Sequence, residues 1–278
     1  MACLENPSAL LPPCLFPRKK TLVPTSESGD DHEKLLPPDY QEILKRSGSQ
    51  VNSWTKKEIY RNLCDGILID GDRKFFSLEK STGKKCCLLS ARELEIIWEN
   101  DNRYWDWIPS TESRFKEVVH LKEVWWMDIT AAIPSRMLSP ETNYVACLVV
   151  NFDRGAYGLD REPWEIKVSY RGKILSQSRQ NIACNVKEGV DPRVALQIKR
   201  LHFLHRIKML PNPPSEPDIK YPCRRDGSQW LEIELGEFTT EGDDGEVVIN
   251  VKETSNYNRK TGITIEGVEF RPQHGHTH

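Results

Sequence analysis

Short stretches of alternating apolar and polar residues recur along the chain from Gly66 onward. Residues 164–170 and 230–235 alternate strictly, which is typical of strands with one face in the core and one in water. Residues 144–152 are apolar almost throughout, as in a strand that is buried on both faces. Turn sequences separate these stretches. The pattern predicts an all-β fold, an antiparallel β-sandwich of the jelly-roll type.

The last predicted strand changes phase within its own length. Ile263 and Ile265 lie on one face, but after Gly267 the apolar positions shift to Val268 and Phe270. A bulge at the glycine accounts for the slip. Further strands are predicted at residues 67–69, 74–78, 85–90, 94–98, 124–129 and 247–251.

Three segments have helical rather than strand periodicity. Residues 39–47 carry apolar side chains three and four positions apart, and Thr55 with Glu58 forms a capping-box sequence before a second short helix. Residues 194–207 also have helical spacing and indicate an amphipathic helix or an ordered insertion. The N-terminal helices are short and precede the first strand.

Composition divides the chain of 278 residues into four parts. Residues 1–34 are rich in proline, serine and charge, which predicts a disordered tail. Residues 35–65 form a short helical linker segment and residues 66–272 the β-domain. Residues 273–278 are a polar tail whose histidines are expected to be unstructured rather than metal-binding.

Charge and cysteine usage narrow the function classes. A net charge of −2 gives no reason to expect nucleic acid as a partner, and no apolar run reaches the length of a membrane span. The eight cysteines form no zinc pattern and no dense disulfide frame. No signal peptide is recognised, so free thiols in a reducing compartment are expected. No metal site and no cofactor are predicted.

Candidate chemistry gathers in residues 94–108, where a strand and a polar turn lead into Tyr104, Trp105 and Trp107. Large flat rings beside Asp and Asn suit a sugar, because the apolar face of a pyranose packs on a ring and its hydroxyls bond to carboxylates and amides. Burial in the core is the favoured interpretation for Trp98 and Trp107. For Trp105, next to the polar turn, the core and sugar-binding interpretations both stay open.

Several sequence motifs together resemble the phloem protein 2 family, the Nictaba-like plant lectins. The resemblance covers roughly residues 35–272 and is greatest to the branch that carries an F-box before the lectin domain. The motifs are YRNLCD (60–65), GKKC (83–86), LSAREL (89–94), RYWDW (103–107), SRFKEV (113–118), MLSPETNY (137–144), WLEIELGEF (230–238), DDGEV (243–247) and GVEFRP (267–272).

The resemblance implies a β-sandwich lectin that binds N-acetylglucosamine oligomers or N-glycan cores in the cytoplasm and nucleus of a plant cell. It implies that the sugar contacts fall on Trp98, Trp105, Glu237 and Asp243. The loop between the two acids is one residue shorter than in the family's tobacco lectin, and an Asp stands where that lectin has a Glu.

The functional expectation is therefore a non-catalytic carbohydrate-binding module with no catalytic residues. The alternative is a substrate receptor of an SCF-type ubiquitin ligase that selects glycoproteins, with the ligase adaptor as partner. No F-box is recognisable before residue 35, and only residues 33–47 resemble the end of the F-box-to-lectin connection. A glycoside hydrolase, which also combines acids with aromatic rings, is the least favoured.

Overall fold

The computed structural model describes residues 34–48, 54–183, 218–225, 227–242, 244–255 and 257–273. The tail predicted at residues 1–34 lies outside these ranges except for its last residue. The predicted helix or insertion at 194–207 also lies outside them, as do Asp243 and residues 274–278.

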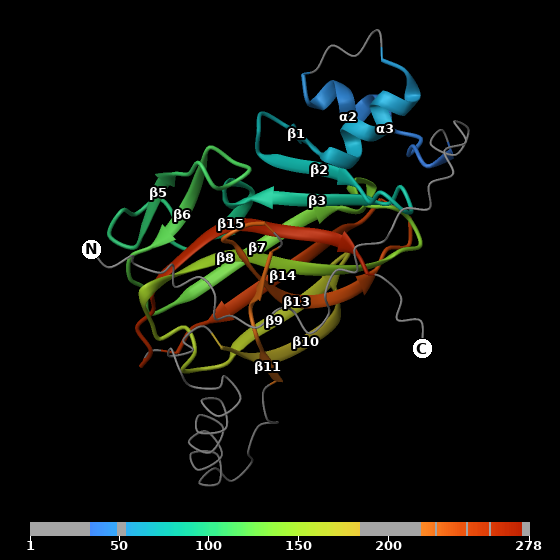
Figure 1. Ribbon diagram of the computed structural model, residues 1–278. Helices are drawn as coiled ribbons and strands as arrows, with labels where there is room; N and C mark the ends of the chain where they lie inside the picture. Colours follow the sequence, from blue (N-terminus) through green and yellow to red (C-terminus); the bar gives the residue numbers. More distant parts are fainter. Residues whose placement is uncertain are drawn as a thin grey trace.

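Two β-sheets pack face to face over a common core, which confirms the predicted antiparallel β-sandwich (Figure 1). Within the described residues the larger sheet has the order β1-β2-β3-β15-β8-β13-β12, and β6 pairs with both β15 and β5. Its strands are β1 (Ile67–Ile69), β2 (Lys74–Leu78), β3 (Lys85–Ser90), β5 (Trp105–Pro109), β6 (Glu117–Leu121), β8 (Asn143–Tyr157), β12 (Cys223–Arg224), β13 (Leu231–Thr239) and β15 (Thr261–Pro272).

The second sheet has the order β11-β10-β9-β14-β7-β4. Every pair in it is antiparallel except β10 with β11, which is parallel. Its strands are β4 (Leu94–Ile96), β7 (Met127–Pro134), β9 (Trp164–Tyr170), β10 (Lys173–Ile182), β11 (Asp218–Lys220) and β14 (Glu246–Glu253).

Strands β8 and β15 form the centre of the larger sheet. Residues 144–150 of β8 are all buried, as their unbroken apolar sequence predicts. Strand β15 slips register against β8 between Ile265 and Gly267, which confirms the predicted bulge. A Cβ atom on Gly267 would lie 1.8 Å from the carbonyl oxygen of Leu89, so the close approach of β3 requires glycine here.

Two helices, α2 (Tyr40–Arg46) and α3 (Lys56–Asp65), lie beside β1 and β2 (Figure 1). Thr55 and Glu58 make the predicted capping box at the start of α3. The helices bury apolar side chains, Leu63 among them, in the same core as the sandwich. Two ion pairs attach this segment to the sheet: Arg46 with Asp70 at 2.6 Å, and Lys85 with Asp39 at 2.7 Å.

The bounds of two strands differ from the predicted ones. The strand expected through Trp98 ends at Ile96, and the strand expected from residue 124 begins at Met127. Trp98, Trp125 and Trp126 therefore lie in connecting segments. Both segments are at one end of the sandwich, because Ile97 donates its backbone N–H to the carbonyl of Asp128, in β7. We call this the tryptophan end.

Candidate functional site

Trp98 is exposed because the backbone turns at this residue. Its φ is +61°, in the left-handed region that a bulky side chain rarely adopts. The following turn is held by the backbone N–H of Asp101, which donates to the carbonyl of Trp98 at 2.9 Å. The ring is 44% exposed, so the expectation that Trp98 belongs to the core is wrong. An outlier of this kind is typical of functional positions, where surrounding contacts hold the strained backbone.

Trp105 has the opposite environment. The side chain is 1% exposed, and its indole Nε1 donates to the carbonyl of Ile97 at 3.1 Å. It is the first residue of β5, opposite Leu121, and its ring fills the core. Trp105 therefore presents no open face on which a sugar can stack, and the structure corrects that expectation. Trp107 packs against the core as expected, with the Arg92 guanidinium carbon 3.4 Å from its ring centroid.

Four aromatic side chains at the tryptophan end line a shallow hollow of about 330 Å³: Trp98, Tyr104, Trp125 and Trp126. The Trp98 and Tyr104 ring centroids are 5.2 Å apart and the ring planes are tilted by 36°. Trp125 is 47% and Trp126 42% exposed. Isolated exposed aromatics are ordinary, but three exposed tryptophans around one hollow form a patch of the kind that binds ligands.

A buried ion pair fixes the backbone beneath this hollow. Lys260 is fully buried, and its Nζ donates to the carbonyl oxygens of Trp125 at 2.6 Å and Asn258 at 2.7 Å. The same Nζ forms an ion pair with Glu253. Burial lowers the pKa of Lys260 to about 8. These contacts hold the Trp125 segment in place before any ligand arrives, which reduces the ordering cost of binding.

Charged residues flank the lining residues in the sequence, and we call Asp101, Arg103, Lys122 and Asp106 the rim of the hollow. Arg103 pairs with Asp101 at 2.6 Å, and hydrogen bonds from this guanidinium lower the pKa of the carboxyl to about 2. Lys122 donates to the carbonyl of Asn102 at 2.7 Å and pairs with Asp106 at 3.2 Å. The rim therefore offers charged donors and acceptors at neutral pH, next to an apolar floor.

Glu237, one of the two acids that the resemblance implies, is not at this end. Glu237 is an exposed residue of β13, and its carboxylate accepts a hydrogen bond from the Gln273 amide just beyond β15. Figure 1 shows β13 and β15 ending at the side of the sandwich away from β5 and β6. We call this side the Glu237 end. The two ends are separated by roughly 25 Å, the length of β7. Asp243 lies outside the described residues.

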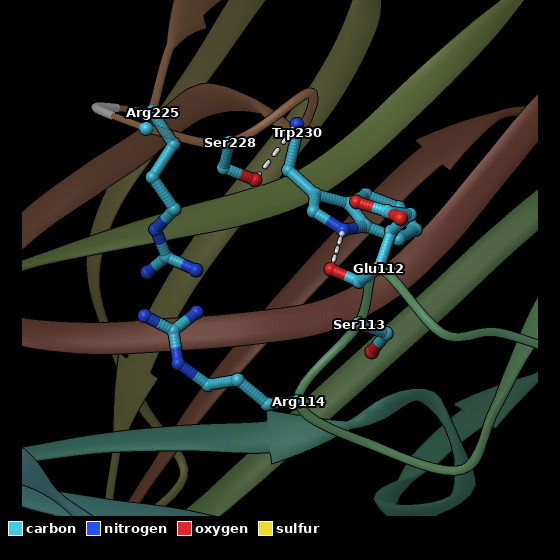
Figure 2. Close-up of a pocket in the computed structure, with 7 residues that line it drawn as sticks. Glu112, Ser113, Arg114, Arg225, Ser228 and Trp230 are labelled. Carbon is cyan, nitrogen blue, oxygen red and sulfur yellow. Dashed lines mark hydrogen bonds between the residues drawn. The ribbon is translucent and has the colours of Figure 1, made fainter.

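A second hollow, of about 260 Å³, is lined by charged and polar groups around Arg225 and Trp230. Figure 2 shows the Arg225 and Arg114 guanidinium groups facing one another, with the indole of Trp230 hydrogen-bonded to the Glu112 carbonyl. The Arg225 side chain is 5% exposed and pairs with three glutamates, Glu232, Glu266 and Glu269. The positive charge of Arg225 is thus already neutralised by these glutamates, and this hollow is not a candidate ligand site.

Sequence reasoning missed Trp125 and Trp126, because the run was assigned to a strand. One signal was available. Successive side chains of a strand point to opposite faces, so two adjacent tryptophans cannot both enter one core. In a strand with one face in water, the pair therefore indicates that one ring is exposed, and both are.

The fold and this hollow define the class: a β-sandwich protein with an exposed aromatic hollow at one end. The model of the family described as phloem protein 2 matches residues 84–272. The chain belongs to the phloem protein 2 family.

Arabidopsis thaliana proteins are similar along most of the chain. F-box protein PP2-B15 is 40% identical over 248 residues, which are 87% of this chain and 83% of that protein. F-box protein VBF is 36% identical over 98% of both chains. Among solved structures, the Podospora anserina GH26-CBM35 β-(1,4)-mannanase is similar to 68% of this chain and 28% of the mannanase chain. The TM-score is 0.32 and the sequence identity is 9%, and values this low support no inference about activity.

Among the described residues, no helix combines the length and hydrophobicity required to cross a bilayer. The same residues contain no convergent group of three or more side chains suited to a metal ion. Cys87 and Cys147 are buried thiols, and burial raises the pKa of each to about 12.

Proposed function

We propose that the chain binds carbohydrate, without catalysis, in the hollow at the tryptophan end. The single observation that supports this most is the set of three exposed tryptophans and Tyr104 around one apolar floor. The proposed ligands are N-acetylglucosamine oligomers or N-glycan cores. Residues 66–272 would carry the binding activity, with residues 35–65 as a linker, in the cytoplasm and nucleus. Expression as a fluorescent fusion would test the location.

The chemistry of the hollow matches a pyranose. Its C–H face would stack on Trp98 or Trp126, since aromatic rings bury a large apolar area at low entropic cost. Hydroxyls at the edge of the sugar would meet the charged rim at Asp101 and Lys122. Charge-assisted hydrogen bonds of this kind are stronger than those between neutral groups.

Calorimetry with N-acetylchitotriose tests the proposal. We expect Trp98→Ala and Trp126→Ala to weaken binding by ~1–3 kcal/mol, which is about one to two orders of magnitude in Kd. Both rings are exposed, so the melting temperature should change little. Trp54→Ala is the matched control, because Trp54 is 38% exposed but lies just before α3, outside the hollow. If the parent chain binds no saccharide on a glycan array, the proposal fails.

A second candidate is substrate recognition for an SCF-type ubiquitin ligase. It is favoured by the names of the similar Arabidopsis proteins, which are F-box proteins. Under this proposal the hollow would select glycoproteins and the N-terminal region would contact the ligase adaptor. The proline- and charge-rich sequence of residues 1–34 argues against that contact. Co-purification of the full chain with the adaptor subunit, beside an F-box relative as positive control, separates the two proposals.

A further inference from the structure

A further exposed ring lies across β15 from the hollow. Tyr157, at the end of β8, pairs with Thr261, the first residue of β15, while Val124 pairs with Lys260, the residue just before β15, on the opposite edge. Two strand spacings, ~10 Å, therefore separate the backbone of Tyr157 from that of Val124. Tyr157 is 41% exposed. The ring is thus close enough to Trp125 for one short oligosaccharide to reach both.

The polar network beneath the hollow continues under Tyr157. The Asn258 amide Nδ2 donates to the carbonyl of Gly158 at 2.7 Å, and the carbonyl of Asn258 accepts from Lys260. A Cβ atom on Gly158 would lie 1.9 Å from the carbonyl oxygen of Arg259, so the two segments are in direct backbone contact. The same buried groups that hold Trp125 therefore also hold the Tyr157 turn.

Two guanidinium groups surround the Tyr157 ring. The guanidinium carbon of Arg161 lies 4.2 Å from the ring centroid and that of Arg259 lies 6.0 Å from it. Arg259 also pairs with Glu123 at 3.2 Å, and so connects the Tyr157 ring to the segment that carries Trp125. A guanidinium stacked on an aromatic face leaves its N–H edge available for a planar anion.

Three acids near this end are engaged by basic groups. Asp101 pairs with Arg103, Asp106 with Lys122, and Glu253 with Lys260. Arg161 is exposed and makes no ion pair with any residue in the described part of the chain. Its charge is available to a ligand that reaches Tyr157.

We propose that the sugar site extends from the tryptophan hollow to Tyr157 and Arg161, and that it takes an acidic oligosaccharide. A neutral N-acetylglucosamine unit occupies the hollow, and the carboxylate of a uronic acid unit pairs with Arg161. This inference rests on the proposed carbohydrate binding and specifies its ligand class. Arginine and carboxylate form two parallel hydrogen bonds, which gives the second position its specificity.

The test uses a hyaluronan tetrasaccharide, in which N-acetylglucosamine and glucuronic acid alternate, and its methyl ester, which lacks the charge. Calorimetry on the full chain should show tighter binding of the acid than of the ester, by roughly five- to tenfold at low salt. Arg161→Gln should remove this preference and leave binding of N-acetylchitotriose within twofold. The preference should shrink as salt is raised.

Arg171→Gln is the matched control. The Arg171 guanidinium carbon lies 5.8 Å from the centroid of the Tyr170 ring, and this arginine–tyrosine pair is at the Glu237 end, where the Arg171 backbone contacts Glu246. It removes the same charge and should leave the acid preference intact.

Each outcome has a distinct meaning. If N-acetylchitotriose binds and Trp98→Ala weakens that binding, but the acid and the ester bind equally, the extension to Arg161 is wrong and the proposed function stands. The extension is equally wrong if Arg161→Gln keeps the preference. If the parent chain binds none of the three saccharides, both proposals fail.

Discussion

The two ends of the sandwich contain similar residue types and use them differently. At the Glu237 end, polar groups bond to one another: the Tyr144 hydroxyl donates to the carbonyl of Lys85, and the Thr240 hydroxyl donates to that of Ser139. At the tryptophan end, acids and bases pair around rings that stay open to solvent. The difference teaches that the apolar surface open to a ligand in this chain lies at the tryptophan end, whereas at the Glu237 end the exposed acid accepts a hydrogen bond from a neighbouring amide.

The largest expected effect contrasts a buried ring with an exposed one. Trp105→Ala should lower the free energy of unfolding by about 3–5 kcal/mol, because it leaves a cavity in the core and removes the indole hydrogen bond to Ile97. Trp98→Ala should cost less than about 1 kcal/mol, because the exposed ring leaves no cavity in the core and alanine, which keeps the Cβ atom, leaves the left-handed backbone as strained as before. Chemical denaturation of both variants measures the contrast. Equal losses of stability would mean that Trp98 is a structural residue and would weaken the sugar-site assignment.

An effect of intermediate size on the free energy of unfolding is expected at the ion pair between Arg46 of α2 and Asp70, which follows β1. Hydrogen bonds from Arg46, and then from Lys74, lower the pKa of Asp70 from an ordinary 3.8 to about 2. Because the folded-state pKa is the lower one, this stabilisation is fully present above about pH 4 and is lost as the pH falls towards 2. The loss amounts to ~2 kcal/mol.

Denaturation of the parent and of Asp70→Asn over this pH range measures the linkage. The variant should be less stable than the parent at pH 6, and the difference should narrow as the pH falls through the folded-state pKa. A constant difference between pH 6 and pH 2.5 would show that the Arg46–Asp70 pair does not contribute in this way.

The smallest expected effect is on saccharide affinity, and it tests which end of the sandwich binds the sugar. Glu237→Gln should leave the Kd for N-acetylchitotriose within twofold, since Glu237 lies roughly 25 Å from the hollow. The family resemblance implies the opposite result. Titration of this variant beside Trp98→Ala decides between the two ends, because a large loss of affinity in Glu237→Gln would move the site to the Glu237 end.

Local patterns were sufficient for much of the fold. The capping box at Thr55, the bulge at Gly267 and the strand predicted at 144–152, which is buried on both faces over residues 144–150, each follow from short-range rules, and the structure has all three. Alternation also identified strands on both sheets. These features depend on a residue and its near neighbours, so the sequence carries them directly.

The site depended on contacts that no local pattern contains. Alternation extends the strand through Trp98, but the backbone becomes left-handed there and turns the ring outward. Lys260 lies 135 residues from the Trp125 carbonyl that it holds. Long-range contacts of this kind decide which rings are exposed, and therefore Trp98, expected in the core, is exposed, while Trp105, for which two interpretations stayed open, is buried.

The central position of β15 has a consequence for the synthesis of the chain. This strand comes late in the sequence, yet it pairs with β3, β6 and β8 in the middle of the larger sheet. On a ribosome, the earlier strands emerge while their principal pairing partner is still untranslated. Their edges stay open to wrong pairing until residues 261–272 appear, which makes nascent chains of this protein candidates for chaperone protection.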